Sequence, residues 1–409
     1  MSEPSPELLN RNLRIFVWFR ALFNARFYYP VFAVFFTDMG LTMAQFLWLN
    51  AIWALTIVIF EVPSGVLADL FGRRKLVIFA AMSMAIEMLL LILAPQHGGW
   101  GLFAVCAVNR LLSGLAEAAA SGADEALAYD SLKTVSENSK VLEKRWDDTL
   151  VSAMRWRSFF GVLAMLIGGF VFDHQSMVGI FGEFPRILSL KLPVILCFIS
   201  SCICIYLAFC LTDFRSLGKE GEHRVSLREV GEGALSAAAW VVKTRWIAVL
   251  IVGAVIIDAV ARTFVTLQSE YFRLLELPDY SFGIIGALVS LVGWIVPCYV
   301  KPLARRFSPR VNVLIAGGIA VAALFGVSQL RGLGGVAAVF TVMASLIHLG
   351  FLLSRYINRD APSEKRASIL SVKNLSLNLG YGLFSGLVAI RLNQTSFSDT
   401  LQLLPLLLK

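Results

Sequence analysis

Charged residues are scarce in this sequence of 409 residues: they account for 16% of it, while hydrophobic residues account for 57%. A soluble domain carries about 25% charged residues. So apolar a composition excludes a soluble protein and predicts a chain that uses lipid as part of its solvent. The formal net charge of +8 does not indicate a nucleic-acid partner, because the lysines and arginines behind it gather in short loops between apolar runs.

Several kinds of functional motif are missing as well. None of the six cysteines forms a Cys-x-x-Cys pair, the four histidines are scattered, and no Walker loop or nucleophile–base–acid set occurs. We therefore expect no cofactor, no metal site and no enzymatic activity, and we interpret the cysteines as small apolar residues. The polar start MSEPSPELLN lacks the features of a secretory leader, so the first apolar run is expected to stay in the membrane.

Most of the sequence consists of long apolar runs. A helix needs about 20 apolar residues to cross the hydrocarbon core of a bilayer. Eleven such runs occur, at residues 13–37, 45–69, 76–95, 100–122, 150–172, 191–212, 246–267, 281–300, 311–330, 333–354 and 367–390. A twelfth begins near Ser398 and is too short to cross fully. The sequence thus predicts an all-α membrane protein with eleven clear spans and a short twelfth.

The loops indicate the orientation of these spans. Lysine and arginine gather in every second loop, as the positive-inside rule requires when the N-terminus is cytoplasmic. The intervening loops hold only Arg186, Lys191, Arg273, Arg331 and Arg391. We therefore expect a multi-pass protein of the inner (cytoplasmic) membrane with its N-terminus inside.

The longest loop, residues 213–245, divides the chain into segments 1–212 and 246–409, which we interpret as two helix bundles. Ser226 and Glu229 fit a capping box at the start of a helix within this loop. The apolar residues that follow have helical spacing: Leu227, Val230, Leu235, Ala238 and Val242. A short amphipathic helix on the cytoplasmic face is expected, with an ordinary linker as the alternative.

Between the second and third spans the sequence reads Gly65-Val-Leu-Ala-Asp69-Leu-Phe-Gly72-Arg73-Arg74. Gly65 permits close approach of two helices, and Gly72 permits a tight turn. This loop resembles the signature loop of the major facilitator superfamily. The resemblance implies two pseudo-symmetric six-helix bundles around a central cavity. It also implies that Gly65, Asp69, Gly72, Arg73 and Arg74 form a conformational latch, with the carboxylate near the N-terminus of span eleven.

Two further stretches carry the same resemblance. Residues 110–114, Arg-Leu-Leu-Ser-Gly, look like the Arg-x-x-x-Gly element of the superfamily, whose arginine is linked to proton coupling. Residues 61–65, Glu-Val-Pro-Ser-Gly, are similar to its drug-exporter branches. These stretches imply a monomeric drug/proton antiporter that works in efflux by alternating access. The fifth span departs from the antiporter pattern, because no proline lies between its glycines at 161, 168 and 169.

Charged side chains at bilayer depth are costly unless they are paired or hydrated, so those in the spans are candidates for function. Residues of the fourth span recur at helical spacing, and we expect them to form one polar stripe facing the cavity: Arg110, Gly114, Glu117, Ser121 and Asp124. For proton coupling we predict Glu117 first and Glu87 second, with Arg110 as their cationic partner. Structural pairing of Arg110 with either carboxylate is the alternative.

The predicted substrate cavity draws on spans one, seven and eleven: Arg20, Asn24, Tyr28, Asp258, Arg262, Lys373, Asn374 and Asn378. Arg20 and Lys373 are expected to attract an anionic or zwitterionic part of the solute. Asp258 and Arg262 are four residues apart and can instead form a structural pair along the helix.

The preferred interpretation is proton-coupled export of a small amphiphilic compound. The expected partners are therefore a small-molecule substrate, protons and membrane lipid. One alternative is proton-coupled uptake of a metabolite or siderophore. An alternative of another class is a non-transporting membrane sensor on the same fold, in which neutralising Glu117 leaves the phenotype intact.

Overall fold

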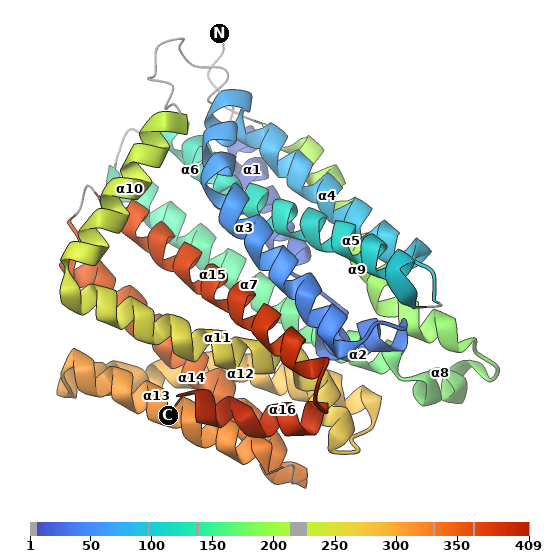
Figure 1. Ribbon diagram of the computed structural model, residues 1–409. Coiled ribbons are helices and arrows are strands. Elements are labelled where there is room, and N and C mark those ends of the chain that lie inside the picture. Colours follow the sequence, from blue (N-terminus) through green and yellow to red (C-terminus); the bar gives the residue numbers. More distant parts are fainter. Residues whose placement is uncertain are drawn as a thin grey trace. The chain divides into compact units, whose positions relative to one another are not determined.

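The computed structural model describes residues 6–96, 98–135, 139–212, 227–329, 332–362 and 365–408. Within these ranges the regular structure is helical, without a β-strand (Figure 1). Ten helices of the described chain are long and apolar enough to cross a membrane. The expected all-α membrane fold is confirmed.

The bounds of the helices follow the predicted spans closely. The first half contains α1 (Pro6–Phe23), η1 (Tyr29–Val31), α2 (Phe32–Asp38), α3 (Met43–Phe71), α4 (Arg73–Leu93), α5 (Gly99–Ala120), α6 (Ala123–Val135), α7 (Ser139–Phe172), α8 (His174–Phe181) and α9 (Arg186–Cys210). The second half contains α10 (Leu227–Lys243), α11 (Arg245–Leu274), α12 (Asp279–Arg306), α13 (Pro309–Ser328), α14 (Gly332–Asp360), α15 (Arg366–Leu392), α16 (Phe397–Leu403) and η4 (Leu404–Leu408).

The first predicted span is interrupted rather than continuous. Helix α1 ends at Phe23, and regular structure resumes only with the 3-10 turn Tyr29–Val31 and then α2. Pro30 explains the interruption, because proline lacks an N–H group and disfavours helical geometry in the residue before it. The backbone groups between Phe23 and Phe32 therefore need partners outside their own helix.

The polar stripe predicted for the fourth span runs past the end of a helix. Helix α5 ends at Ala120, Gly122 has a φ of 79°, and α6 begins at Ala123. A positive φ favours glycine because a Cβ atom would clash with the backbone. The predicted stripe from Arg110 to Asp124 therefore lies on two helices rather than on one.

The chain forms two compact units, which we describe separately. The first unit comprises residues 1–29, 59–94 and 104–230. In it α4 lies against α9, and α1 lies against both α7 and α9. Their shared core is rich in small side chains, including Ala80, Ala81, Ala116, Cys204 and Ala208. Small residues let helix backbones approach closely, which is how helices associate in lipid.

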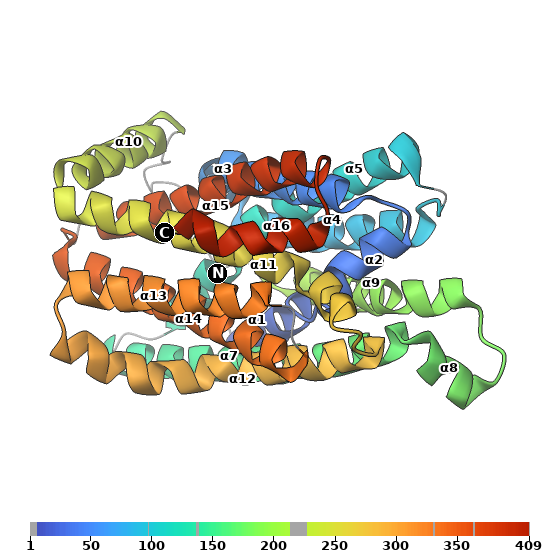
Figure 2. The same ribbon diagram turned by 60° about the horizontal axis from the view of Figure 1, so that its bottom comes forward.

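The second unit comprises residues 30–58, 95–103 and 231–409, so it includes α2 and the first part of α3. Figure 2 shows α13 alongside α14 in this unit, and α11 contacts α13, α14 and α15. Large side chains join the small ones in its core, such as Ile251, Leu352, Leu353 and Tyr356. The predicted division into residues 1–212, 213–245 and 246–409 stays a prediction, since residues 213–226 lie outside the described ranges.

Helix α10 occupies the described part of the long central loop. Its Ala237 and Val241 are buried in the core of the second unit, and Lys365 Nζ donates to Ser236 Oγ at 2.8 Å. Leu235 and Val242, two of the residues expected on the apolar face, are instead 72% and 73% exposed. Helix α10 therefore packs against the second unit through a face next to the predicted apolar face, and the side chains of Leu235 and Val242 stay exposed.

Candidate functional site

The break in the first span brings charged and polar side chains together in the first unit. Phe27 N–H donates to Cys197 Sγ at 3.2 Å, and Ser200 Oγ donates to the Leu22 carbonyl at 2.9 Å. Cys197 and Ser200 are three residues apart, so they lie on the same face of α9. Two α9 side chains thus satisfy backbone groups that the break leaves without helical partners.

A buried ion pair lies beside this break. Arg26 Nη1 is 2.8 Å from Glu87 Oε1, and the two side chains are 5% and 0% exposed. Asn109 Nδ2 donates to the Glu87 carbonyl oxygen at 2.8 Å, which joins α5 to α4. Glu87, predicted as the second proton carrier, is therefore engaged by Arg26, a residue not predicted as part of the site.

Arg110 belongs to the same network. Its Nη2 donates to the Tyr28 hydroxyl oxygen at 3.2 Å, and its Nε donates to Asn109 Oδ1 at 2.9 Å. Arg110 and Tyr28 are both buried. Arg26, Tyr28, Glu87, Asn109 and Arg110 thus form one cluster, which we call the α1-break cluster.

Glu117 differs from the other charged residues of the fourth span. Its side chain is exposed, whereas Arg110 and Asp124 are buried. It also lies within electrostatic range of Arg26. Of the predicted proton-coupling residues, Glu117 is accessible at the surface of its unit, while Glu87 and Arg110 are enclosed.

Two residues predicted for the substrate cavity have partners within the first unit. Arg20 Nε is 2.9 Å from Asp124 Oδ2, and Arg20 Nη2 is 3.0 Å from Glu125 Oε2. Asn24 Nδ2 donates to the Arg20 carbonyl at 2.8 Å. Arg20 therefore joins α1 to α6 by two ion pairs, and a solute would have to compete with both carboxylates for it.

The second unit brings together residues of α11 and α15. Arg262 Nη2 is 2.6 Å from Asp258 Oδ2, and its Nη1 donates to Asn378 Oδ1 at 3.0 Å. The guanidinium lies over the Tyr381 ring, 5.2 Å from the centroid, and the Tyr381 hydroxyl is 2.9 Å from Thr266 Oγ1. Asp258, Arg262, Thr266, Asn378 and Tyr381 form what we call the α11–α15 cluster.

This cluster lies near the middle of both helices. The Arg262 side chain is 28% exposed, so it is accessible although it has three partners. Asn374 is exposed one helical turn before Asn378, and Lys373 is half-buried beside it. Of the predicted residues of spans seven and eleven, the structure therefore brings Asp258, Arg262 and Asn378 together beside the Tyr381 ring.

The loop between α3 and α4 contains the turn that its sequence predicts. Gly72 has a φ of 96° and precedes the first residue of α4. Arg73 forms an ion pair with Asp130 and donates to the Ala126 carbonyl at 2.9 Å, both on α6. The side-chain surroundings of Gly65 and Asp69 lie outside what the structure describes, so the latch across the two halves stays a prediction.

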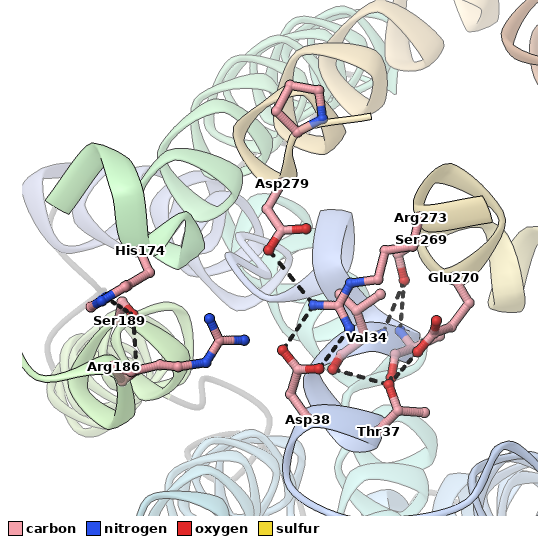
Figure 3. A network of polar contacts seen from close by, with 12 residues as sticks. Val34, Thr37, Asp38, His174, Arg186, Ser189, Ser269, Glu270, Arg273 and Asp279 are labelled. Atoms are coloured by element: carbon pink, nitrogen blue, oxygen red, sulfur yellow. Dashed lines mark hydrogen bonds and ion pairs between the residues drawn. The ribbon is translucent and has the colours of Figure 1, made fainter. Parts of the chain in front are cut away.

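A polar network that the sequence did not point to occupies the end of α11 in the second unit (Figure 3). Arg273 Nη1 and Nη2 are 2.6 and 2.8 Å from the two carboxylate oxygens of Asp38, and Asp279 is 3.6 Å from Arg273. Thr37 donates to the Glu270 carboxylate. The only signal in the sequence was that these charges stand at the ends of apolar runs.

Ser269 completes this network, which we call the outer-end network. Its hydroxyl oxygen accepts from the backbone N–H groups of Ala33 and Val34 at 3.0 and 3.2 Å. These groups open α2 and have no helical acceptor of their own. Ion pairs and hydrogen bonds to both side-chain and backbone groups therefore hold α2 against α11.

Comparisons with known proteins agree with this fold. The Major Facilitator Superfamily profile matches residues 15–385. A search of curated proteins finds no match. Among solved structures, a variant of the nucleoside transporter NupG is similar with a TM-score of 0.76 and 12% identity, covering 98% of this chain and 96% of that one.

Two other solved structures are similar over most of their length. A bacterial homologue of the human lysosomal transporter Spinster has a TM-score of 0.67 and 16% identity, with 95% of this chain and 83% of that one covered. A D-xylose–proton symporter has a TM-score of 0.63 and 12% identity, with 98% and 94% covered. At such identities the likeness shows the fold alone.

Proposed function

The chain belongs to the Major Facilitator Superfamily, and we propose that it is a secondary active transporter that exports a small amphiphilic solute from the cytoplasm by alternating access, driven by protons. The α11–α15 cluster carries this proposal. A cation near the middle of apolar helices is costly in lipid, and such residues mark solute or ion pathways. Arg262 is partly exposed at that depth, which suits a solute-binding group.

The chemistry of the cluster favours one class of solute. A guanidinium has five N–H donors in a planar fork, and Asp258 and Asn378 occupy only part of that fork. The remaining donors suit a carboxylate, a phosphate or another strong acceptor. Tyr381 offers an aromatic ring to an apolar portion of the same molecule. We therefore infer a solute with one acidic or strongly accepting group and one apolar part.

Glu117 is the group that we propose for proton coupling. Its side chain is exposed on the first unit, and it lies within electrostatic range of Arg26 in the α1-break cluster. Protonation removes the attraction between the carboxylate and the guanidinium, so it changes the electrostatic balance beside the broken helix. The ion pair between Glu87 and Arg26 must open before Glu87 can take part.

The setting of this activity follows from the basic loops. We propose a monomer in the inner membrane with a cytoplasmic N-terminus, as the distribution of lysine and arginine favours. Uptake by proton symport is the second candidate, because the fifth span lacks the proline of the antiporter pattern. One structural neighbour is also described as a proton symporter.

Solute binding can be tested with a thermal-shift screen of the purified protein at an acidic and a neutral pH. A true solute should raise the unfolding temperature of the wild-type protein and bind about tenfold more weakly to Arg262→Lys, a loss of about 1.4 kcal/mol. Lysine keeps the charge but loses the planar fork that matches an acidic group. Arg391→Lys, which changes an exposed arginine outside the cluster, should bind as the wild type does.

Coupling and direction can be tested in proteoliposomes with the solute found by that screen. If the protein is an exporter, an inward proton gradient should drive the solute outward, and Glu117→Gln should abolish this response while exchange of labelled for unlabelled solute continues. Solute movement along the proton gradient would establish uptake instead. Binding without movement in either direction would contradict transport and favour a membrane sensor.

A further inference from the structure

A groove that the proposed transport cycle does not use opens between the beginnings of α11 and α13 in the second unit. It has a volume of about 880 Å³, and its walls include Arg245, Trp246 and Val249 from α11 and Arg310, Val313 and Leu314 from α13. Both helices begin here, at the side that the basic loops assign to the cytoplasm. The groove thus lies at headgroup depth.

The floor of the groove is apolar and exposed. Val249 is 72% exposed and Leu314 is 73% exposed. Along α11 the exposed surface continues through Val252 and Ile256, three and seven residues after Val249. Residues at this spacing share one helix face. This apolar face of α11 therefore extends from the groove toward the middle of the membrane, in the direction in which an acyl chain lies.

The rim of the groove is cationic. Arg245 and Arg310 are both exposed, and within the described chain neither guanidinium has an ion-pair or hydrogen-bond partner. Trp246 lines the groove together with these cations, in keeping with the preference of tryptophan for membrane interfaces. Such a rim complements a phosphate.

A second groove differs from this one because an acidic residue lines it. In the first unit, Arg14 and Arg145 line a smaller groove of about 360 Å³ together with Asp148. Arg145 also donates to Asn10 Oδ1 at 2.7 Å. A carboxylate is therefore already present beside those cations, whereas no acidic residue of the described ranges lines the groove between α11 and α13. Of the two grooves, the one between α11 and α13 is therefore the one whose cations have no acidic residue of the described chain beside them, so an external anion can balance their charge.

We propose that the groove between α11 and α13 binds one anionic phospholipid of the cytoplasmic leaflet. Its phosphate lies between Arg245 and Arg310, and an acyl chain follows Val249, Val252 and Ile256. A zwitterionic lipid fits less well, because its ammonium group would add a further positive charge to a rim whose described residues include no carboxylate. The site stands apart from the α11–α15 cluster and does not depend on the solute or on the direction of transport.

Native mass spectrometry of the full-length protein in detergent tests this site, with dioleoylphosphatidylglycerol as the probe and dioleoylphosphatidylcholine as the reference lipid. The wild-type protein should retain one phosphatidylglycerol molecule far more tightly than phosphatidylcholine. Replacing both arginines, Arg245→Gln with Arg310→Gln, should weaken retention about thirtyfold, as expected for the loss of two cations beside an anionic lipid. Arg305→Gln removes one exposed cation from the last turn of α12, outside the groove, and should leave retention unchanged.

A second variant keeps both cations and blocks the floor. Leu314→Trp changes an exposed position, so the helix should fold normally, yet it should also lose the bound lipid. Equal retention of the two lipids, or phosphatidylglycerol retention that survives the double arginine change, would overturn the proposal. Displacement of the lipid by an equal concentration of inorganic phosphate would also overturn it, because the site would then recognise a free anion.

Discussion

Among single residues, Arg26 and Glu87 should have the largest effect on stability, because they form a buried ion pair. Removing one partner of such a pair leaves an uncompensated charge, which destabilises a protein by about 3–5 kcal/mol. Glu87→Gln should therefore lower the thermal unfolding midpoint in detergent markedly, because Arg26 is only 5% exposed and cannot reach water. Glu117→Gln changes an exposed carboxylate and should leave the midpoint near that of the wild type.

The same pair allows a double-mutant cycle. Replacing both residues by methionine removes both buried charges at once, and such replacements are often neutral or stabilising. The double variant Arg26→Met with Glu87→Met should therefore be more stable than either single variant. Additive destabilisation would show instead that the two side chains stabilise the protein independently of each other.

Among the helices, α7 approaches the broken first span more closely than any side chain would allow. A Cβ atom on Gly168 would lie 1.7 Å from the Phe27 carbonyl oxygen. Gly168→Ala should therefore force α7 away from the break and destabilise the protein by about 1–3 kcal/mol, the usual effect of overpacking. On the same helix, a Cβ atom on Gly161 would meet no neighbouring atom of the described chain within 4 Å, so Gly161→Ala should be neutral or slightly stabilising by thermal unfolding.

The helices were the most predictable feature of the chain, because hydrophobic length alone determines where a span can lie. The interruption of the first span was harder to predict. Pro30 was visible in the sequence, but the long apolar run around it favoured a continuous first span. Cys197 and Ser200, far away in the sequence, supply hydrogen bonds to Phe27 N–H and to the Leu22 carbonyl beside the break. Periodicity within a span carries no information about such partners.

The candidate site was predictable in part for a similar reason. Asp258, Arg262 and Asn378 stand out as polar residues in apolar runs, and the structure brings them together. Arg26 is also a charged residue in an apolar run, but its partner Glu87 could not be inferred from spacing. Several oppositely charged residues could pair with Arg26, and the tertiary fold determines which one does. A single sequence does not contain this information.

For the chain as a whole, the outer-end network places α2, from the first half of the sequence, in the same compact unit as α11. Alternating access requires contacts between the two halves to form and break on each side of the membrane in turn. The bidentate pair of Asp38 with Arg273 lies where α2 and α11 end, and the Ser269 contacts lie at the start of α2. On the orientation that the basic loops predict, we expect this network to hold the outer side closed.

Arg273→Gln should release that closure, because it removes the cation that Asp38 and Asp279 share. A cysteine placed at Ala33, which is fully buried against Ser269, reports the change when Cys202 and Cys298, the two exposed native thiols, are replaced by serine. Maleimide should label this cysteine slowly in the parent and about tenfold faster in Arg273→Gln, a shift of about 1.4 kcal/mol in the opening equilibrium. Arg391→Gln, an exposed change outside the network, should match the parent. Equal labelling in all three would show that the outer-end network stabilises the unit without controlling access to it.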